Sequence, residues 1–185
     1  MVAEIRSLPQ DTKRRLSSAQ VAVTADNVVK ELVENSGTTS STQFRIDVVV
    51  RNAGLDFLSV RDNGSGVSVV DAPEMMKQHT TSKLRSYEDL AHVQSYGFRG
   101  EALHSIADIS GAVTVTTRTR NEMAARVYKF DRVGKIVSEG TISMSEGTFI
   151  KVEKLFSNVA VRREIAATAK AVAKMEKRIR ELVTA

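Results

Sequence analysis

The sequence contains no cysteine and no tryptophan, has only two prolines, and draws 5% of its residues from the aromatic types. The lack of cysteine excludes disulfides, thiolate metal sites and a cysteine nucleophile. The three histidines, His79, His92 and His104, show no metal-ligand spacing, so we expect neither a zinc site nor histidine-based catalysis. The scarcity of aromatic rings argues against a stacking platform for single-stranded nucleic acid.

The hydrophobic runs in the sequence are also short. None reaches the length of a membrane span, and the N-terminus lacks the apolar core of a signal peptide. We therefore expect a soluble intracellular protein with no membrane contact. A net charge of +5 suits contact with nucleic acid or nucleotide, but it also suits a slightly basic soluble surface.

The chain is nevertheless long and apolar enough for one folded domain, with 185 residues of which 42% are hydrophobic. Periodicity predicts a helix over 17–35 and a strand over 44–50. Their arrangement predicts an α+β fold, a mostly antiparallel sheet with helices on one face. Further strands are expected at 57–60, 113–117, 128–130, 136–137 and 149–152, and further helices at 71–79, 86–93, 100–109 and 160–183. In the last helix, Ile165, Val172, Met175, Ile179 and Leu182 are the expected apolar contacts.

The first predicted helix carries a carboxylate and an amide one turn apart. Glu31 and Asn35 lie about 40° apart on one helix edge, beside the apolar stripe of Val28 and Leu32. A carboxylate there can take a proton from water, and a neutral amide oxygen suits Mg²⁺, which keeps most of its waters. The alternative is an ordinary amphipathic helix with solvated polar residues. Glu34 is expected to pair with Lys30 on the surface.

A second stretch, Asp62-Asn63-Gly64-Ser65-Gly66, follows a predicted strand. A carboxylate at a strand end can accept a hydrogen bond from an exocyclic amine such as that of adenine. Gly64 and Gly66 would let the backbone approach a flat base closely. A plain hairpin turn is the competing interpretation. Thr148 enters a later strand after Gly147 and could bring a hydroxyl beside Asp62.

The third stretch is rich in glycine and precedes a predicted helix. Gly97 and Gly100 permit exposed backbone N–H groups, and the helix directs its positive end at them, which is the arrangement of a phosphate site. Arg99 could add charge, and Phe98 could anchor the loop in an apolar pocket. A simple helix cap is the alternative. The sequence has no Walker-type glycine loop, so this is not a P-loop. Thr81, Ser82 and Lys83 offer hydroxyls and a cation nearby.

Together these stretches resemble the N-terminal ATPase domain of the MutL/PMS mismatch-repair family, a branch of the GHKL (Bergerat) ATPases. The likeness runs from about Leu16 to Arg163 and favours a eukaryotic PMS-type member. It implies a two-layer GHKL sandwich over residues 16–185, after an irregular arm at 1–15. The segments that carry it are KELVENS at 30–36, RDNGSGV at 61–67, TSK at 81–83, YGFRGEAL at 96–103 and LFSNVAVRR at 155–163.

The resemblance also implies roles for individual residues. Glu31 would be the general base for water, Asn35 the Mg²⁺ ligand, and Asp62 the partner of the adenine amine, with Gly64 and Gly66 lining its pocket. Thr148 would assist Asp62. Thr81, Ser82 and Lys83 would touch nucleotide or order the loop. An ATP lid over the phosphates would comprise Gly97, Phe98, Arg99, Gly100, Glu101, Ala102 and Leu103.

For the protein as a whole, the resemblance implies ATP and Mg²⁺ as cofactors. It also implies a MutL-homologue partner subunit that pairs when ATP is bound, a mismatch-recognition protein, weak non-specific DNA contact and a nuclear location. The second and C-terminal family domains are missing, so we expect a fragment or an abbreviated homologue with slow hydrolysis.

The sequence departs from the family pattern just after the first motif. The family continues Asn-Ser-Leu-Asp-Ala-Gly-Ala, whereas residues 35–41 read NSGTTSS, so Thr38 replaces the acidic residue. This favours a second hypothesis, a catalytically degenerate subunit that binds nucleotide or a partner. A third hypothesis is a DNA-contacting module that uses the basic residues of the last helix, although Glu164, Glu176 and Glu181 interleave with them.

Overall fold

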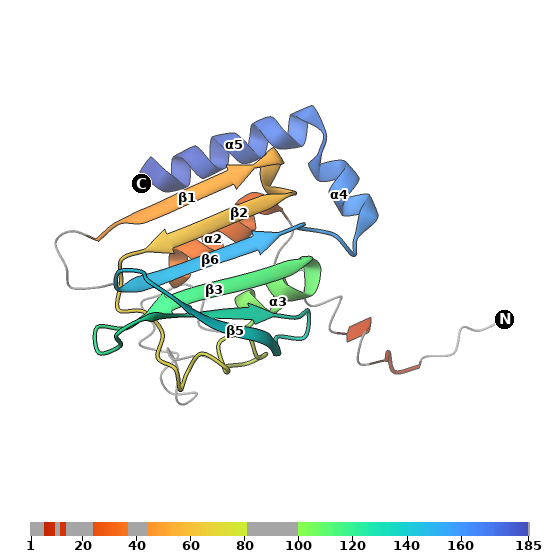
Figure 1. Cartoon of the computed structure of the whole chain (residues 1–185). Coiled ribbons are helices and arrows are strands. Elements are labelled where there is room, and N and C mark those ends of the chain that lie inside the picture. The colour runs from red at the N-terminus through yellow and green to blue at the C-terminus, as the bar shows by residue number, and fades with distance from the viewer. Residues whose placement is uncertain (1–5, 10–11, 14–23, 37–43, 81–99, 185) are drawn as a thin grey trace, which may run out of the picture.

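The computed structural model describes residues 6–9, 12–13, 24–36, 44–80 and 100–184. Within these residues, six strands form one sheet, and four α-helices and a 3₁₀ turn complete the fold (Figure 1). The predicted segments 17–23 and 86–93 lie outside the described residues, and the division at residues 15 and 16 stays a prediction. Among the described helices, none combines the length and the apolar character that a bilayer crossing requires.

The sheet has the strand order β1-β2-β6-β3-β4-β5, and all of its described pairings are antiparallel. This confirms the predicted α+β class, because the described helices α2 and α3 pack against strands of this sheet. The predicted pairing across residues 133–134 is also correct and joins β4 to β5. The strands are β1 (Ile46–Arg51), β2 (Phe57–Asp62), β3 (Ala112–Arg118), β4 (Ala125–Phe130), β5 (Ile136–Ile142) and β6 (Gly147–Glu153).

Alternation along the strands gives the sheet two different faces. Leu58 and Val60 of β2 are buried against the helices, whereas Arg61 between Val60 and Asp62 is exposed. Successive side chains of a strand point to opposite faces, so the covered face collects the apolar residues. Its central strands contribute Leu58, Val60, Val113, Val115, Ile150 and Val152 to the core.

Helix α2 (Ala25–Asn35) is the amphipathic helix that the spacing of Val28, Val29 and Leu32 predicts, and all three side chains are buried. It contacts β2, helix α3 (Ala102–Ile109) and helix α5 (Ala169–Thr184). Figure 1 shows α2 and α3 behind the sheet, on the same face. An ion pair joins α2 to α5, because Arg178 Nη1 lies 2.9 Å from the Oδ2 atom of buried Asp26.

Two secondary-structure predictions are wrong. Residues 71–79 form a series of turns, not a helix, with i to i+3 hydrogen bonds such as Glu74 N to Asp71 O. The predicted helix over 160–183 is two helices, α4 (Ala160–Ala166) and α5. Thr168 separates them, because its hydroxyl donates to Ile165 O at 2.8 Å and its carbonyl accepts from Val172 N.

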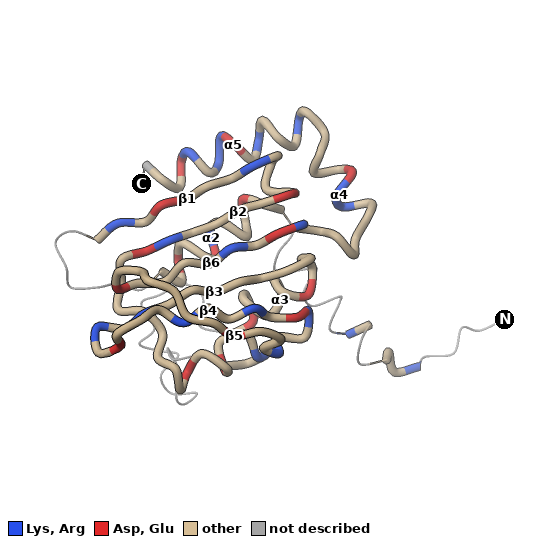
Figure 2. The backbone as a smooth tube through the Cα atoms, viewed as in Figure 1, with Lys and Arg blue, Asp and Glu red and all other residues tan. Residues whose placement is uncertain are grey.

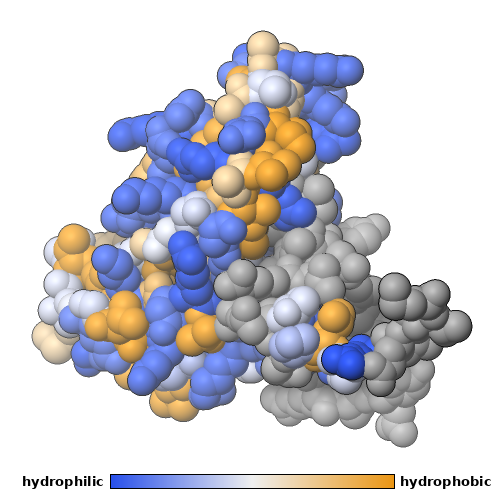
Figure 3. All heavy atoms as spheres, turned by 90° about the vertical axis from the view of Figure 1, so that its right-hand side faces the viewer, coloured by the Kyte–Doolittle hydropathy of each residue, from blue (hydrophilic) through white to orange (hydrophobic). Residues whose placement is uncertain are grey.

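The break between α4 and α5 changes which apolar residues are buried. Met175 is buried and Ile179 packs against the core, as predicted. Ile165 is 62% exposed on α4, beside Val161 at 68%, so its predicted role as a core contact is wrong. Figure 3, turned toward α4, shows apolar surface between charged side chains.

Candidate functional site

Asp62 ends strand β2 and faces the helix-covered side of the sheet with 8% of its surface exposed. Its partner in the neighbouring strand is Thr148 of β6. The Oδ1 atom of Asp62 accepts hydrogen bonds from Gly64 N at 2.9 Å and from Thr148 N at 3.1 Å. Both backbone donors share Oδ1, and a carboxylate can accept about four hydrogen bonds, so the group has capacity for a further donor.

Burial makes the ionised form of the Asp62 carboxyl less stable than it would be in water. Burial raises the pKa of the Asp62 carboxyl above its usual value, and hydrogen bonds from Gly64, Thr148 and Ser36 oppose that rise. A buried carboxylate is stabilised by each further hydrogen-bond donor that reaches it.

Two glycines beside Asp62 allow close backbone contacts. Gly147 has φ +129, and a Cβ atom there would lie 2.2 Å from Asp62 O. Gly66 has φ +71, and a Cβ atom there would lie 2.3 Å from Arg118 O. The segment after Gly66 is held by Thr117, whose hydroxyl oxygen accepts from Val67 N at 2.7 Å. The Asp-Asn-Gly-Ser-Gly stretch is therefore fastened to β3 and β6 rather than forming a simple hairpin turn.

The C-terminal end of α2 lies beside the same carboxylate. Ser36, which follows Asn35, is buried, and its hydroxyl donates to Leu32 O at 3.1 Å while also lying within hydrogen-bonding reach of Asp62. Glu31 and Asn35 are both half-buried, one residue before Leu32 and Ser36 respectively. The fold thus brings the end of the helix that carries the predicted base and amide next to Asp62. Glu34 pairs with Lys30 at 2.5 Å, as predicted.

A backbone contact joins the two chain segments that flank residues 81–99. His79 N donates to Gly100 O at 3.0 Å, and a Cβ atom on Gly100, at φ +63, would lie 2.3 Å from Thr80 O. The His79 ring lies 3.3 Å from the Glu101 carboxylate. We call this contact of 79–80 with 100–101 the neck.

Helix α3 begins directly after the neck. Its first residue is Ala102, two positions later than predicted, and Leu103 packs against the core. The remaining predicted site residues, Thr81, Ser82, Lys83, Gly97, Phe98 and Arg99, lie outside the described residues. No group of three or more acidic or histidine side chains within the described segments could hold a metal ion.

Comparison with known proteins identifies the class. Residues 23–162 match the model of the histidine kinase-, DNA gyrase B-, and HSP90-like ATPase family. The chain therefore belongs to this family of ATPases, as its motifs and its sheet with helices on one face predict.

The more similar relatives place the chain within that family. Human PMS1 protein homolog 1 is 41% identical over 179 residues, which cover 97% of this chain and 19% of that protein. The crystal structure of the N-terminal domain of a DNA repair protein is 32% identical with a TM-score of 0.74, covering 94% of this chain and 49% of that chain. The chain is thus an N-terminal ATPase domain of the MutL/PMS mismatch-repair type, and it spans about a fifth of the human relative's length.

A more distant structure shares the fold. The Aquifex aeolicus MutL ATPase domain complexed with ADP is 21% identical with a TM-score of 0.50, and the match covers 97% of this chain and 54% of that chain.

Sequence reasoning missed two residues of this site. It assigned no role to Ser36, although a hydroxyl directly after a helix commonly caps it and can reach a neighbour. It also overlooked Thr117, which fixes Val67. Thr117 occupies a polar position on the covered face, in alternation with Val113 and Val115, and that irregularity is a usable signal.

Proposed function

We propose that this domain binds ATP, with the adenine amine donating to Asp62. The observation that carries the proposal is the preset carboxylate: Asp62 is buried and is fixed through Oδ1 by Gly64 N and Thr148 N. A carboxylate held in this way can accept a further hydrogen bond. Gly64 and Gly66 permit the close approach of a flat base. The ADP complex of the Aquifex aeolicus MutL ATPase domain, which has the same fold, supports a nucleotide as the ligand.

Helices α3 and α2 would contact the phosphates of the bound nucleotide. The first N–H groups of α3, which have no partner within the helix itself, would offer positive charge to phosphate oxygens. Asn35 would hold Mg²⁺, which when bound neutralises phosphate charge during attack by water. Glu31, on the same edge of α2 as Asn35, takes the proton from that water. Residues 97–103 would cover the phosphates.

In the cell, the domain would act as a slow, nucleotide-gated switch of a mismatch-repair protein. ATP binding would favour pairing with a MutL-homologue subunit, and a mismatch-recognition protein and DNA would couple to that cycle. The likeness to human PMS1 protein homolog 1 supports this role and a nuclear location. The matched chain is a small part of that relative, so partners and location extend the proposal to a whole protein.

The test compares Glu31→Ala with Glu34→Ala. Both residues are half-buried on α2, but Glu34 already pairs with Lys30. We expect Glu31→Ala to keep its affinity for ATP and to lower phosphate release by about two to four orders of magnitude. Glu34→Ala should change neither. The measurements are calorimetric titration with ATP and Mg²⁺ and single-turnover phosphate release.

The same data separate the competing functions. Normal hydrolysis by Glu31→Ala contradicts the proposed mechanism, and failure of the parent chain to bind ATP contradicts the nucleotide site altogether. Tight binding without phosphate release by the parent chain would instead favour the catalytically degenerate subunit, which the altered segment at 37–41 suggests.

A further inference from the structure

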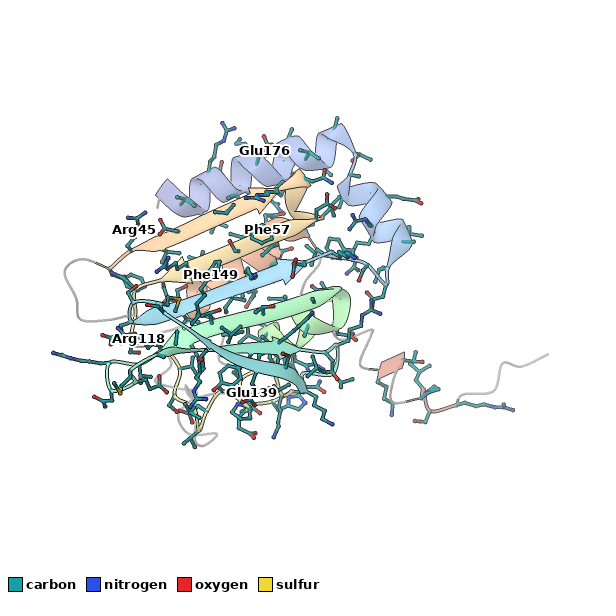
Figure 4. All side chains as sticks on the ribbon, viewed as in Figure 1. Arg45, Phe57, Arg118, Glu139, Phe149 and Glu176 are labelled. Carbon is teal, nitrogen blue, oxygen red and sulfur yellow. The ribbon has the colours of Figure 1, made fainter. Side chains whose placement is uncertain are left out.

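The sheet is hollowed at the end where β1 begins and β2 stops. A pocket of about 300 Å³ lies there, lined by Arg45, Asp47, Arg61, Asp62, Asn63 and Ser145. Figure 4 shows Arg45 at this end of β1, and Figure 2 shows charged positions gathered at the same ends of β1 and β2. Asp47 and Arg61 are register partners, so they share one side of the sheet. The Arg61 side chain therefore lies on the opposite side of β2 from the Asp62 carboxylate.

Ser145 supplies the hydroxyl of this pocket. It lies in the connection between β5 and β6, is exposed, and precedes the first residue of β6 by two positions. Its Oγ atom accepts a hydrogen bond from Arg61 Nη2 at 3.2 Å. An exposed hydroxyl on such a connection is accessible to a modifying enzyme, and this one already lies against a guanidinium.

Arg61 has donor capacity for an anion. A guanidinium carries five N–H donors. Within the part of the chain that the structure describes, no ion pair joins Arg61 to a carboxylate, and its Nη2 atom contacts the neutral Ser145 hydroxyl. A negatively charged group on Ser145 would therefore find a cation already in place.

Arg45 is the second cation of the pocket. Its Nε and Nη2 atoms donate to Asp47 Oδ1 at 2.8 and 2.7 Å. The side chains of Arg45 and Asp47 are 75% and 47% exposed, so water screens this pair and it contributes little to stability. A phosphate, which has more charge and three acceptor oxygens, would compete with Asp47 for the guanidinium.

We propose that Ser145 is a phosphorylation site and that Arg61 and Arg45 hold its phosphate. In the modification, Ser145 Oγ attacks the γ-phosphorus of ATP bound to a protein serine kinase. A bond forms between Oγ and phosphorus, and the bond from phosphorus to the bridging oxygen breaks. ADP leaves with that electron pair, and the hydroxyl proton passes to a base of the kinase. The phosphoserine carries a charge of about −1.5 to −2 at neutral pH, which suits two guanidinium groups.

The bound phosphate would brace the end of the sheet that carries Asp62. The backbone of Arg45 is joined to Asn63, because Arg45 N donates to Asn63 Oδ1 at 2.7 Å and Asn63 N donates to Arg45 O at 3.3 Å. Arg61 and Asn63 are the sequence neighbours of Asp62. A phosphate held by both arginines would therefore tie the connection before β6 to β1 and β2. This contact does not depend on ATP binding by the domain.

The first experiment observes the phosphate by ³¹P NMR. The chain is made with Ser145→phosphoserine, encoded genetically. The matched control is Ser143→phosphoserine, which lies exposed in the same connection and has no arginine contact among the described residues. Cations stabilise the dianion, so the titration midpoint of the phosphate at 145 should lie about 0.5–1 pH unit below that at 143. Adding Arg45→Gln/Arg61→Gln should bring the two midpoints together. Equal midpoints without the arginine substitutions overturn the proposal.

Thermal unfolding measures the bracing. Ser145→phosphoserine should raise the midpoint temperature of the chain by about 2–4 °C at neutral pH, because it adds charge-assisted hydrogen bonds between segments. Ser143→phosphoserine should not raise it. An unchanged or lower midpoint for the phosphate at 145 contradicts the bracing. A gain that survives Arg45→Gln/Arg61→Gln contradicts it too, because another surface would then hold the phosphate.

Phosphopeptide mapping shows whether the site is used. The protein is isolated from its own cells with phosphatases inhibited, and mass spectrometry locates the phosphate. We expect phosphate on Ser145. Phosphate on Ser143 alone, or on neither serine, overturns the assignment.

Discussion

The two faces of the sheet are built from the same strands and carry different side chains. On β2, Leu58, Val60 and Asp62 face the helices, whereas Phe57 and Arg61 face away from them. The helix-covered face joins an apolar core to one buried carboxylate, whereas the opposite face, which we call the open face, carries cations and aromatic rings. Substitutions on the two faces should differ accordingly.

The largest contrast should come from truncating one apolar residue on each face. Leu58→Ala removes a fully buried side chain and should lower the free energy of unfolding by about 2–5 kcal/mol. Val49→Ala, on the open face with 44% of its surface exposed, should change it by about 0.5 kcal/mol or less. Urea unfolding followed by circular dichroism measures both. Equal losses would show that the open face is packed in solution.

A second contrast compares two glycines. Gly147→Ala places a Cβ atom against Asp62 O at positive φ and should cost on the order of 1–3 kcal/mol of stability. A Cβ atom on Gly140 of β5 would lie more than 4 Å from the heavy atoms around it. Gly140→Ala should therefore change stability by about 0.5 kcal/mol or less. Thermal unfolding of the two variants tests this. A neutral Gly147→Ala would contradict the close contact of β6 with Asp62.

The smallest effect should be the pH dependence of Asp62. Its pKa is raised in the folded state, so the stability that it contributes is complete below the usual pKa of 3.8 and is lost as pH rises through the raised value. The stability of Asp62→Asn relative to the parent chain should therefore increase across that range. Unfolding at a series of pH values from below 3.8 to neutrality measures the difference.

Asp56 provides the control of opposite sign. Hydrogen bonds from Asn52 and Arg163 lower the pKa of the exposed Asp56 carboxyl. Its contribution is therefore present above its usual pKa and is lost as pH falls through the lowered value. Asp56→Asn should lose stability relative to the parent chain as pH rises, the reverse of Asp62→Asn. Parallel slopes for the two variants would contradict the assigned environment of Asp62.

Alternation and motif order were enough to predict the sheet, the α+β class and the ATPase family. They also indicated that Asp62 and Thr148 meet, and the strand register pairs these two residues. The residue roles in catalysis and nucleotide binding stay predictions. The prediction of one continuous helix failed at Thr168, because the Thr168 hydroxyl donates a hydrogen bond to the backbone carbonyl of Ile165. The set of side chains that meet on the open face could not be foreseen, because alternation separates the two faces of one strand but does not give the register between strands.

The neck bears on how much the length of this domain can vary among relatives. Thr80 and Gly100 are in backbone contact, so the two ends of the sequence between them are held at a fixed spacing. Lengthening the chain between two fixed ends costs little, about 0.6 kcal/mol for each doubling of its length. Relatives could therefore carry a longer or shorter sequence between these two ends while the described sheet stays the same.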